Sequence, residues 1–213
     1  MRTPADRLDL VEEIVEIGGR RLRLLQPRDS EALLDEQAFE QEEFLPYWAE
    51  LWPSGVALAR HVAGHVWSGA SVLELGCGLA LPSIAAALAG ARVLATDWSP
   101  EAIVVAAENA RRNDLEVETA RCSWADPGQL VTRAPWDVVL AADVLYEGRD
   151  VPLLLDLLPR LVDERGEVLL ADPRRPRLDS FLEAAAERWR VETVLEQESP
   201  RVVLLRLRAR ERA

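Results

Sequence analysis

The chain has 213 residues, a length that suits one compact domain with a buried hydrophobic core. Hydrophobic residues make up 49% of it and charged residues 29%, which is the composition of a folded protein and excludes general disorder. The net charge is −12, and all 25 basic residues are arginines. Since so acidic a chain binds polyanions poorly, we expect it to bind neither nucleic acid nor a membrane surface.

Cysteine content and apolar runs suggest a compartment. No run is apolar enough to span a bilayer, and Met1–Arg7 lacks the apolar stretch of a secretory signal. Cys77 and Cys122 are too few for a disulfide framework, so we expect a reduced, cytoplasmic protein. His61 and His65 lie four residues apart on an expected helix but have no acidic partner nearby, so no metal centre is expected.

Residues 1–45 are expected to add a β-hairpin and an acidic helix to a core formed by residues 46–213, the whole chain being a single domain. Glu13–Gln26 carries apolar residues on both sides of Gly18-Gly19, which supplies the positive φ angles of a tight turn. Asp29-Ser30 can cap a helix that runs to about Phe44. From residue 31 to residue 50 there are seven acids and no base. This segment is either a solvated helix face or a docking surface for a basic partner.

From Ser71 onward, short apolar runs alternate with helix-length segments, a pattern typical of a doubly wound, mostly parallel α/β sheet. A final hairpin through Gln197–Pro200 should place one antiparallel strand in this Rossmann-like, seven-stranded sheet. The expected strands are Ser71–Leu75, Arg92–Thr96, Glu116–Arg121, Trp136–Ala142, Glu167–Ala171, Arg190–Glu196 and Arg201–Arg208. The expected helices are Leu81–Ala89, Ser99–Asn113, Val151–Val162 and Leu178–Trp189.

The strongest chemical motif is Glu74-Leu-Gly-Cys-Gly-Leu-Ala80, which follows the first core strand and opens a helix. Gly76 and Gly78 allow a turn tight enough for a ligand to touch the main chain. Leu81 stands where a dinucleotide fingerprint needs its third glycine, and no Gly-Lys-Ser/Thr follows as in a P-loop. The remaining pattern, acid-x-Gly-x-Gly, is the one that S-adenosylmethionine enzymes use.

Three further strand ends carry polar or aromatic residues. Asp97, 21 residues beyond Gly76, lies where a nucleotide site places a carboxylate for ribose hydroxyls, and Trp98 can cover an adenine ring. Alternatively, Trp98 is buried and an exposed Asp97 caps the next helix. Ser123 and Trp124 follow the third strand, where Ser123 can accept from the adenine amino group, although a plain polar turn explains this pair equally well.

Asp143 and Tyr146 follow the fourth strand. Ligands of doubly wound sheets bind beyond the carboxyl ends of the strands, at the point where the strand order reverses. We therefore expect Asp143 and Tyr146 to face the methyl group and its acceptor.

These segments together resemble the class I S-adenosylmethionine-dependent methyltransferases, and within them the family-16 methyltransferases. That family includes protein-lysine methyltransferases, such as the one acting on the electron-transfer flavoprotein β subunit, and bacterial proteins labelled as nicotinamide N-methyltransferases. The resemblance spans most of the chain between Tyr47 and Arg175. It rests on Pro46–Gly55, Val72–Pro82, Ala95–Ser99, Asp143–Tyr146 and Ala171–Pro173.

The resemblance implies S-adenosylmethionine as cofactor, with an acid that orients its ammonium group and an Asp-x-x-Tyr pair at the acceptor entrance. Two positions depart from the family pattern. Ala80 replaces a common third glycine, which costs little if its φ is negative, and Ser123 stands where many relatives carry Asp. The implied catalytic residues are Asp143 and Tyr146, and the implied cofactor residues are Trp52, Glu74, Gly76, Gly78, Asp97, Trp98, Ser123 and Trp124.

Three functions remain open at this stage. The first is methylation of a protein lysine, with the acidic segment of residues 31–50 guiding a basic substrate. The second is N-methylation of a small molecule in a pocket lined by Tyr47, Trp48 and Trp52. The third is a non-catalytic binding module on the cofactor fold. In the first two, Asp143 either accepts a proton or orients the acceptor.

Overall fold

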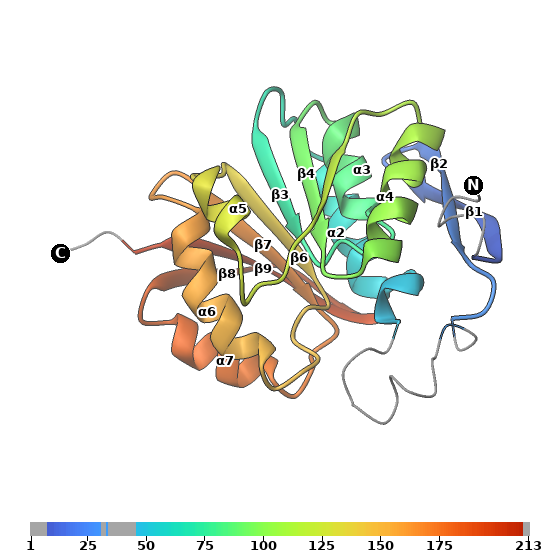
Figure 1. Cartoon of the computed structure of the whole chain (residues 1–213). Helices are drawn as coiled ribbons and strands as arrows, with labels where there is room; N and C mark the ends of the chain where they lie inside the picture. Colours follow the sequence, from blue (N-terminus) through green and yellow to red (C-terminus); the bar gives the residue numbers. More distant parts are fainter. Residues whose placement is uncertain (1–7, 31–32, 34–45, 211–213) are drawn as a thin grey trace.

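A computed structural model describes residues 8–30, 33 and 46–210 of the chain. The expected acidic helix up to Phe44 lies outside these residues. The described part forms a two-stranded hairpin and a seven-stranded sheet flanked by helices (Figure 1). The strands of the hairpin are β1 (Leu10–Ile17) and β2 (Arg20–Pro27), joined through Gly18 and Gly19 at φ +57° and +76°. The strands of the sheet are β3 (Ser71–Leu75), β4 (Arg92–Asp97), β5 (Glu118–Arg121), β6 (Val138–Ala142), β7 (Glu167–Asp172), β8 (Trp189–Glu198) and β9 (Arg201–Ala209).

The sheet has the order β5-β4-β3-β6-β7-β9-β8. Neighbouring strands from β5 to β7 pair in parallel, while β9 pairs antiparallel with both β7 and β8. The single antiparallel strand therefore lies in the C-terminal hairpin, as predicted. The chain builds outward from β3 to β5 and then returns to the other side of β3, so the topological switch point lies between β3 and β6.

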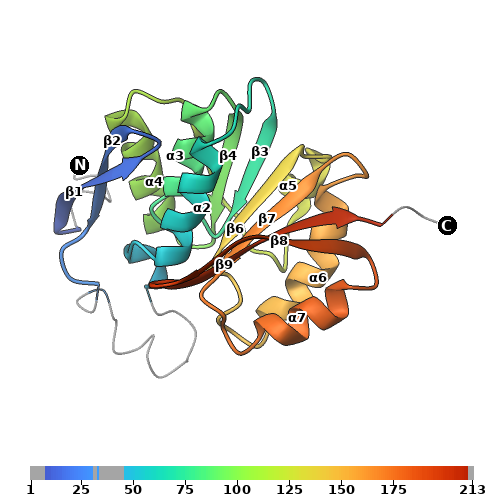
Figure 2. The ribbon, with the colours of Figure 1, turned by 180° about the vertical axis from the view of Figure 1, so that it is seen from behind.

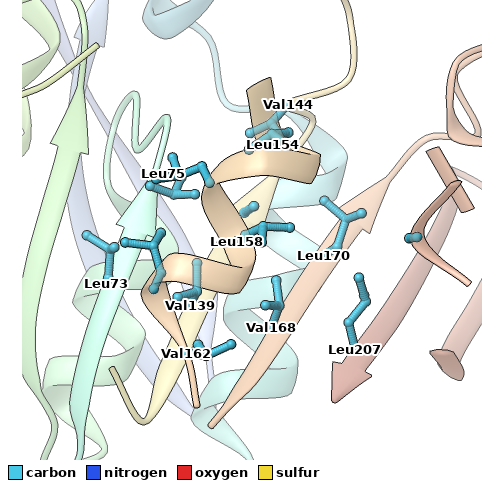
Figure 3. Close-up of a cluster of buried hydrophobic side chains, with 14 of the residues drawn as sticks. Leu73, Leu75, Val139, Val144, Leu154, Leu158, Val162, Val168, Leu170 and Leu207 are labelled. Carbon is cyan, nitrogen blue, oxygen red and sulfur yellow. The ribbon is translucent and has the colours of Figure 1, made fainter. Parts of the chain in front are cut away.

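Helices cover both faces of the sheet, as the two opposite views show (Figures 1 and 2). Buried Leu73 of β3 and Val139 of β6 pack against Leu158 of α6 on one face (Figure 3). On the other face, alternate residues such as Val72 pack against Ile84 of α3. The first face carries α5 (Gly128–Thr132), α6 (Asp150–Leu161) and α7 (Leu178–Ala185); the second carries α2 (Pro53–Ala63), α3 (Leu81–Leu88) and α4 (Pro100–Arg112).

Several expected element boundaries differ: the hairpin begins at Leu10 rather than Glu13, and β5 begins at Glu118 rather than Glu116. Two others are wrong for tertiary reasons. Helix α7 ends at Ala185 rather than Trp189, because Trp189 is buried as the first residue of β8 and pairs there with Ala209. Strand β6 begins at Val138 rather than Trp136. The Trp136 indole donates instead to the carbonyl of Leu130 in α5, a short helix that the sequence patterns did not indicate.

The N-terminal hairpin docks on α4 through two asparagines. Asn109, fully buried, accepts from the amide of Leu25 at 2.6 Å and donates to the Leu25 carbonyl at 3.1 Å. It also donates to the carbonyl of Leu79, in the turn between β3 and α3. Asn113 repeats the two-way pairing with Arg23, one helical turn later. The two asparagine side chains thus make hydrogen bonds with the β2 backbone that a neighbouring strand would otherwise make. Through its bond to Leu79, Asn109 also connects the hairpin to the glycine turn.

Other expectations concern isolated residues. Cys77 and Cys122 are both free and buried. Nδ1 of His65 donates to the carbonyl of His61, and the described residues contain no group of three or more potential ligands that could hold a metal ion. Across those same residues, no helix combines the length and apolar character needed to cross a bilayer.

Candidate active site

A cavity of about 440 Å³ lies at the carboxyl ends of β3, β4 and β6, beside the short 3-10 helix η3 (Tyr47–Ala49). This is the switch point of the sheet, where doubly wound folds bind their ligands. The structure brings all ten predicted site residues into the cavity wall. They are Trp52, Glu74, Gly76, Gly78, Asp97, Trp98, Ser123, Trp124, Asp143 and Tyr146.

The glycine turn lies under the cavity in a left-handed conformation. Gly76 has φ +64° and Gly78 has φ +48°. A Cβ on Gly78 would lie 3.0 Å from the carbonyl oxygen of Trp48, so this close approach of two backbones requires glycine. The expectation of a negative φ at Ala80 is wrong: its φ is +61°, and its methyl group is fully buried beside Cys77. This conformation costs an alanine about 1–2 kcal/mol.

Asp97 is buried at the end of β4 and connects two segments of the site. Its Oδ2 accepts from the amide of Gly78 at 3.0 Å, and its Oδ1 accepts from the amide of Ser99 at 2.9 Å. Burial raises the pKa of Asp97, although the backbone donors oppose this. Ser99 caps α4 by accepting from Ala102. The alternative of a buried Trp98 with an exposed Asp97 is wrong, because Trp98 is half-buried and Asp97 is the buried member.

Glu74 also lines the cavity, but α3 already uses one of its oxygens. Oε2 accepts from both the amide and the hydroxyl of Ser83. Oε1 is therefore the oxygen left to accept from a ligand. Burial raises the pKa of Glu74 to about 8, so the carboxyl is largely protonated at neutral pH until a cation lies beside it.

Asp143 lines the same cavity, directly after β6. It has φ +56°, and its amide donates to Ala171 of β7 at 2.8 Å. Its carboxylate accepts from both Nε (2.8 Å) and Nη2 (3.2 Å) of Arg175, which also lines the cavity. The sequence patterns missed Arg175 as a site residue. Its position shortly after β7, another strand that ends at this edge, is the signal that could have found it.

Aromatic rings form the wall beside Asp143. The Trp52 indole donates to the carbonyl of Tyr47 at 2.7 Å. The ring of Tyr47 lies 5.0 Å from that of Tyr146, edge to face, and 6.3 Å from that of Trp52. Burial raises the pKa of the Tyr146 phenol, so this hydroxyl stays protonated and can donate a hydrogen bond at neutral pH.

Asp172 lies behind Arg175 and outside the cavity wall. It is fully buried, and its Oδ1 accepts from the amide of Arg175 at 2.6 Å. Its Oδ2 is buried with no hydrogen-bond donor among the residues that the structure describes. Burial raises the pKa of Asp172 to about 6. This carboxyl fixes the backbone from which Arg175 reaches Asp143.

The remaining site residue, Ser123, lies on the rim. Its hydroxyl accepts from the amide of Ala125 at 3.3 Å, and the residue itself is exposed. Trp124 is half-buried, and its ring would lie 3.5 Å from a Cβ built on Gly76. Ser123 thus forms a polar turn that is also open to the cavity.

Comparison with known proteins decides the family. A family profile described as "Lysine methyltransferase" matches residues 36–188. The chain belongs to this family. Among curated members, an electron transfer flavoprotein beta subunit lysine methyltransferase of Xenopus laevis is 35% identical over 166 residues, 75% of this chain and 65% of that protein. The human histone-arginine methyltransferase METTL23 is 31% identical over 151 residues, 68% of this chain and 80% of that protein.

The chain spans only part of the length of some relatives. For example, the match covers 52% of the electron transfer flavoprotein beta subunit lysine methyltransferase of Danio rerio. Solved structures agree on the fold. A ribosomal protein L11 methylase of Lactobacillus delbrueckii subsp. bulgaricus has a TM-score of 0.55 at 24% identity, covering 76% of this chain and 81% of that one. The 16S rRNA N2 G1207 methyltransferase of T. thermophilus was solved with AdoMet and guanosine. It has a TM-score of 0.67 at 14% identity, and the match covers 94% of this chain and 51% of that one.

Proposed function

We propose that this family member transfers a methyl group from S-adenosylmethionine to the side-chain nitrogen of a lysine in a partner protein. One observation carries the proposal: the glycine turn, Asp97, Asp143 and Tyr146 all line a single cavity. A cofactor bound at the glycine turn and Asp97 and an acceptor beside Asp143 and Tyr146 would share this cavity. The names of the relatives support lysine as the acceptor.

The residues present fit this cofactor. Gly76 and Gly78 let a ligand approach the backbone, Asp97 is buried where ribose hydroxyls would bind, and Trp98 lies beside it. The free oxygen of Glu74 suits an ammonium group, whose charge would also lower the pKa of that carboxyl. When bound, S-adenosylmethionine supplies an electrophilic methyl group on a positively charged sulfur.

The chain's own contribution to transfer is positioning and exclusion of water. A lysine amine with an ordinary pKa of about 10.4 must become neutral to react, which costs about 4.6 kcal/mol at pH 7. Tyr47, Trp52 and Tyr146 form an aromatic wall against which an acceptor can be held. Asp143 is buried beside this wall, so it can orient the acceptor through its paired carboxylate.

A small-molecule acceptor is the second candidate, and the same aromatic wall favours it. An uncharged ring such as nicotinamide can stack there, and its pyridine nitrogen needs no deprotonation. The acidic segment that favours a basic protein partner covers residues 31–50. Most of it, residues 31–45 apart from residue 33, lies outside the residues that the structure describes. Of its acids, Glu50 accepts from the hydroxyl of Ser30 at 2.6 Å and lines the cavity.

A transfer assay with radiolabelled S-adenosylmethionine distinguishes the candidates. The acceptors are purified electron transfer flavoprotein, core histones, nicotinamide, and host lysate separated into protein and small-molecule fractions. The test variant is Asp143→Asn, because Asn tolerates the left-handed conformation of this position. Asp156→Asn, on the exposed face of α6, is the matched control.

We expect label in a discrete protein band with the parent and with Asp156→Asn, at least 100-fold less with Asp143→Asn, and equal cofactor affinity by calorimetry in all three. Label confined to small molecules would favour the second candidate. Cofactor binding without any transfer would favour a binding module, and unchanged turnover in Asp143→Asn would contradict the assigned role of Asp143.

We also propose that the chain acts as a single domain in the cytoplasm. The hairpin of residues 10–27 supports one domain, because Asn109 of α4 bonds to it and to the glycine turn at once. Free, buried cysteines at positions 77 and 122 suit a reducing compartment. Sedimentation will show whether the chain is a monomer, and limited proteolysis whether the hairpin is protected together with the core.

A further inference from the structure

Asp143 already holds a cation before any acceptor enters. Arg175 donates to both oxygens of its carboxylate, at 2.8 and 3.2 Å. The Cζ atom of the same guanidinium lies 5.9 Å from the centroid of the Trp52 ring. A carboxylate and an aromatic face are the two groups that proteins combine to bind organic cations. Arg175 therefore occupies a cation site in the wall of the proposed acceptor pocket.

The pair is held firmly, and its two charges offset each other. The side chain of Asp143 is 5% exposed and that of Arg175 is 34% exposed. The buried Asp172 holds the amide of Arg175 from behind. The other titratable groups around the pair are the carboxyl of Asp172, which lies outside the cavity wall, and the phenols of Tyr47 and Tyr146. A half-buried, bidentate pair of this kind is costly to separate, since it would leave a buried carboxylate alone.

The charge of the pair decides which form of an amine can approach it. A free carboxylate attracts an ammonium group and favours the protonated amine, which has no lone pair to react. A carboxylate neutralised by a guanidinium neither attracts an ammonium group nor favours the protonated amine, and the guanidinium repels a second cation. The two arrangements therefore select opposite protonation states of the same acceptor.

We propose that Arg175 is a specificity-determining residue, which neutralises Asp143 so that the site excludes the ammonium form of an amine acceptor and admits the uncharged form. This inference rests on the proposed function. The acceptor loses its proton to solvent before it enters, a nitrogen–carbon bond then forms as the carbon–sulfur bond breaks, and the positive charge passes from sulfur to nitrogen. The methylated product is a cation, so the same pair favours its release.

Binding of small amines to the protein saturated with S-adenosylhomocysteine tests this assignment. The charged probe is n-butylammonium, which matches a lysine side chain in length, and the uncharged probe is nicotinamide. The variants are Arg175→Met, Arg175→Gln and the conservative Arg175→Lys. Arg174→Gln is the matched control, because Arg174 pairs with Glu196 and does not line the cavity.

At pH 7.5 we expect Arg175→Met and Arg175→Gln to bind n-butylammonium at least tenfold more tightly than the parent, with unchanged affinity for nicotinamide. Arg175→Lys and Arg174→Gln should behave as the parent does. Adding Asp143→Asn to Arg175→Met should abolish the gain. This pattern would show that the positive charge at position 175 controls the binding of n-butylammonium. If Arg175 had only a structural role, Arg175→Lys would not restore the affinities of the parent.

Two results would overturn the inference. Equal binding of n-butylammonium by the parent and by Arg175→Met would mean either that an acceptor cation displaces Arg175 or that Asp143 and Trp52 form no cation site. Equal gains for both probes would mean that Arg175 only fills space. Failure of the parent to bind S-adenosylhomocysteine would contradict the proposed function instead, and the amine titrations would then be run on the protein alone.

Discussion

Replacing Gly78 by alanine tests the geometry of the cofactor end. Two effects act against the new methyl group: the residue has φ +48°, and its Cβ would lie 3.0 Å from the carbonyl oxygen of Trp48. The left-handed conformation costs an alanine about 1–2 kcal/mol, of which about 0.4–1 kcal/mol is offset by the lower entropy of the unfolded chain. Displacing the Trp48 backbone adds about 1–3 kcal/mol. We expect Gly78→Ala to lower the free energy of unfolding by about 1–4.5 kcal/mol.

Two matched variants separate these effects. Gly76 has φ +64°, but its Cβ would meet no atom closer than 3.4 Å, so Gly76→Ala should lose only about 1 kcal/mol. Gly128 has an ordinary φ, and its Cβ would make only an ordinary contact, with Oδ1 of Asp126 at 3.9 Å, so Gly128→Ala should change stability by less than about 0.5 kcal/mol. The buried Ala80 at φ +61° shows that this turn accepts a left-handed alanine.

Urea denaturation of the four proteins measures these differences, and calorimetry with S-adenosylhomocysteine measures the effect on the site. Gly78→Ala should weaken binding at least tenfold, because moving Trp48 also moves the neighbouring cavity wall. If Gly78→Ala is as stable as Gly76→Ala, the close approach to Trp48 does not determine the fold of the turn, and the argument for glycine at position 78 fails.

Two further predictions concern buried polar groups. Burial raises the pKa of Glu74 from an ordinary 4.5 to about 8, so the folded protein holds a proton that the unfolded chain releases, and stability without cofactor should fall as the pH rises from 4.5 to 8. Glu74→Gln should reduce this slope in urea denaturation at pH 5 and pH 8; an unchanged slope would mean that another group is responsible. Asn109→Ala should cost about 2–4 kcal/mol, because it leaves the amide of Leu25 and the carbonyl of Leu79 unpaired. The more exposed Asn113→Ala should cost about 1 kcal/mol, and equal losses would contradict the role given to Asn109.

Local patterns in the sequence determined most of the fold. Alternating apolar runs and helical segments predicted seven strands, and the Gly18-Gly19 pair predicted the N-terminal turn. The same patterns predicted that Gly76, Gly78, Asp97 and Asp143 line one cavity, because the carboxyl ends of parallel strands meet at one edge of a sheet. These features depend on a few neighbouring residues, so the sequence by itself is enough to predict them.

The tertiary structure alone decided what those residues do to one another. Asp143 and Arg175 are 32 positions apart and meet only because β6 and β7 are neighbours. The positive φ of Ala80 follows from its place in the buried glycine turn, and Trp189 leaves α7 because it pairs with Ala209. Each of these outcomes depends on contacts between distant segments, which have no local periodicity or spacing. The ion pair between Asp143 and Arg175 therefore became visible only when the strands were placed side by side.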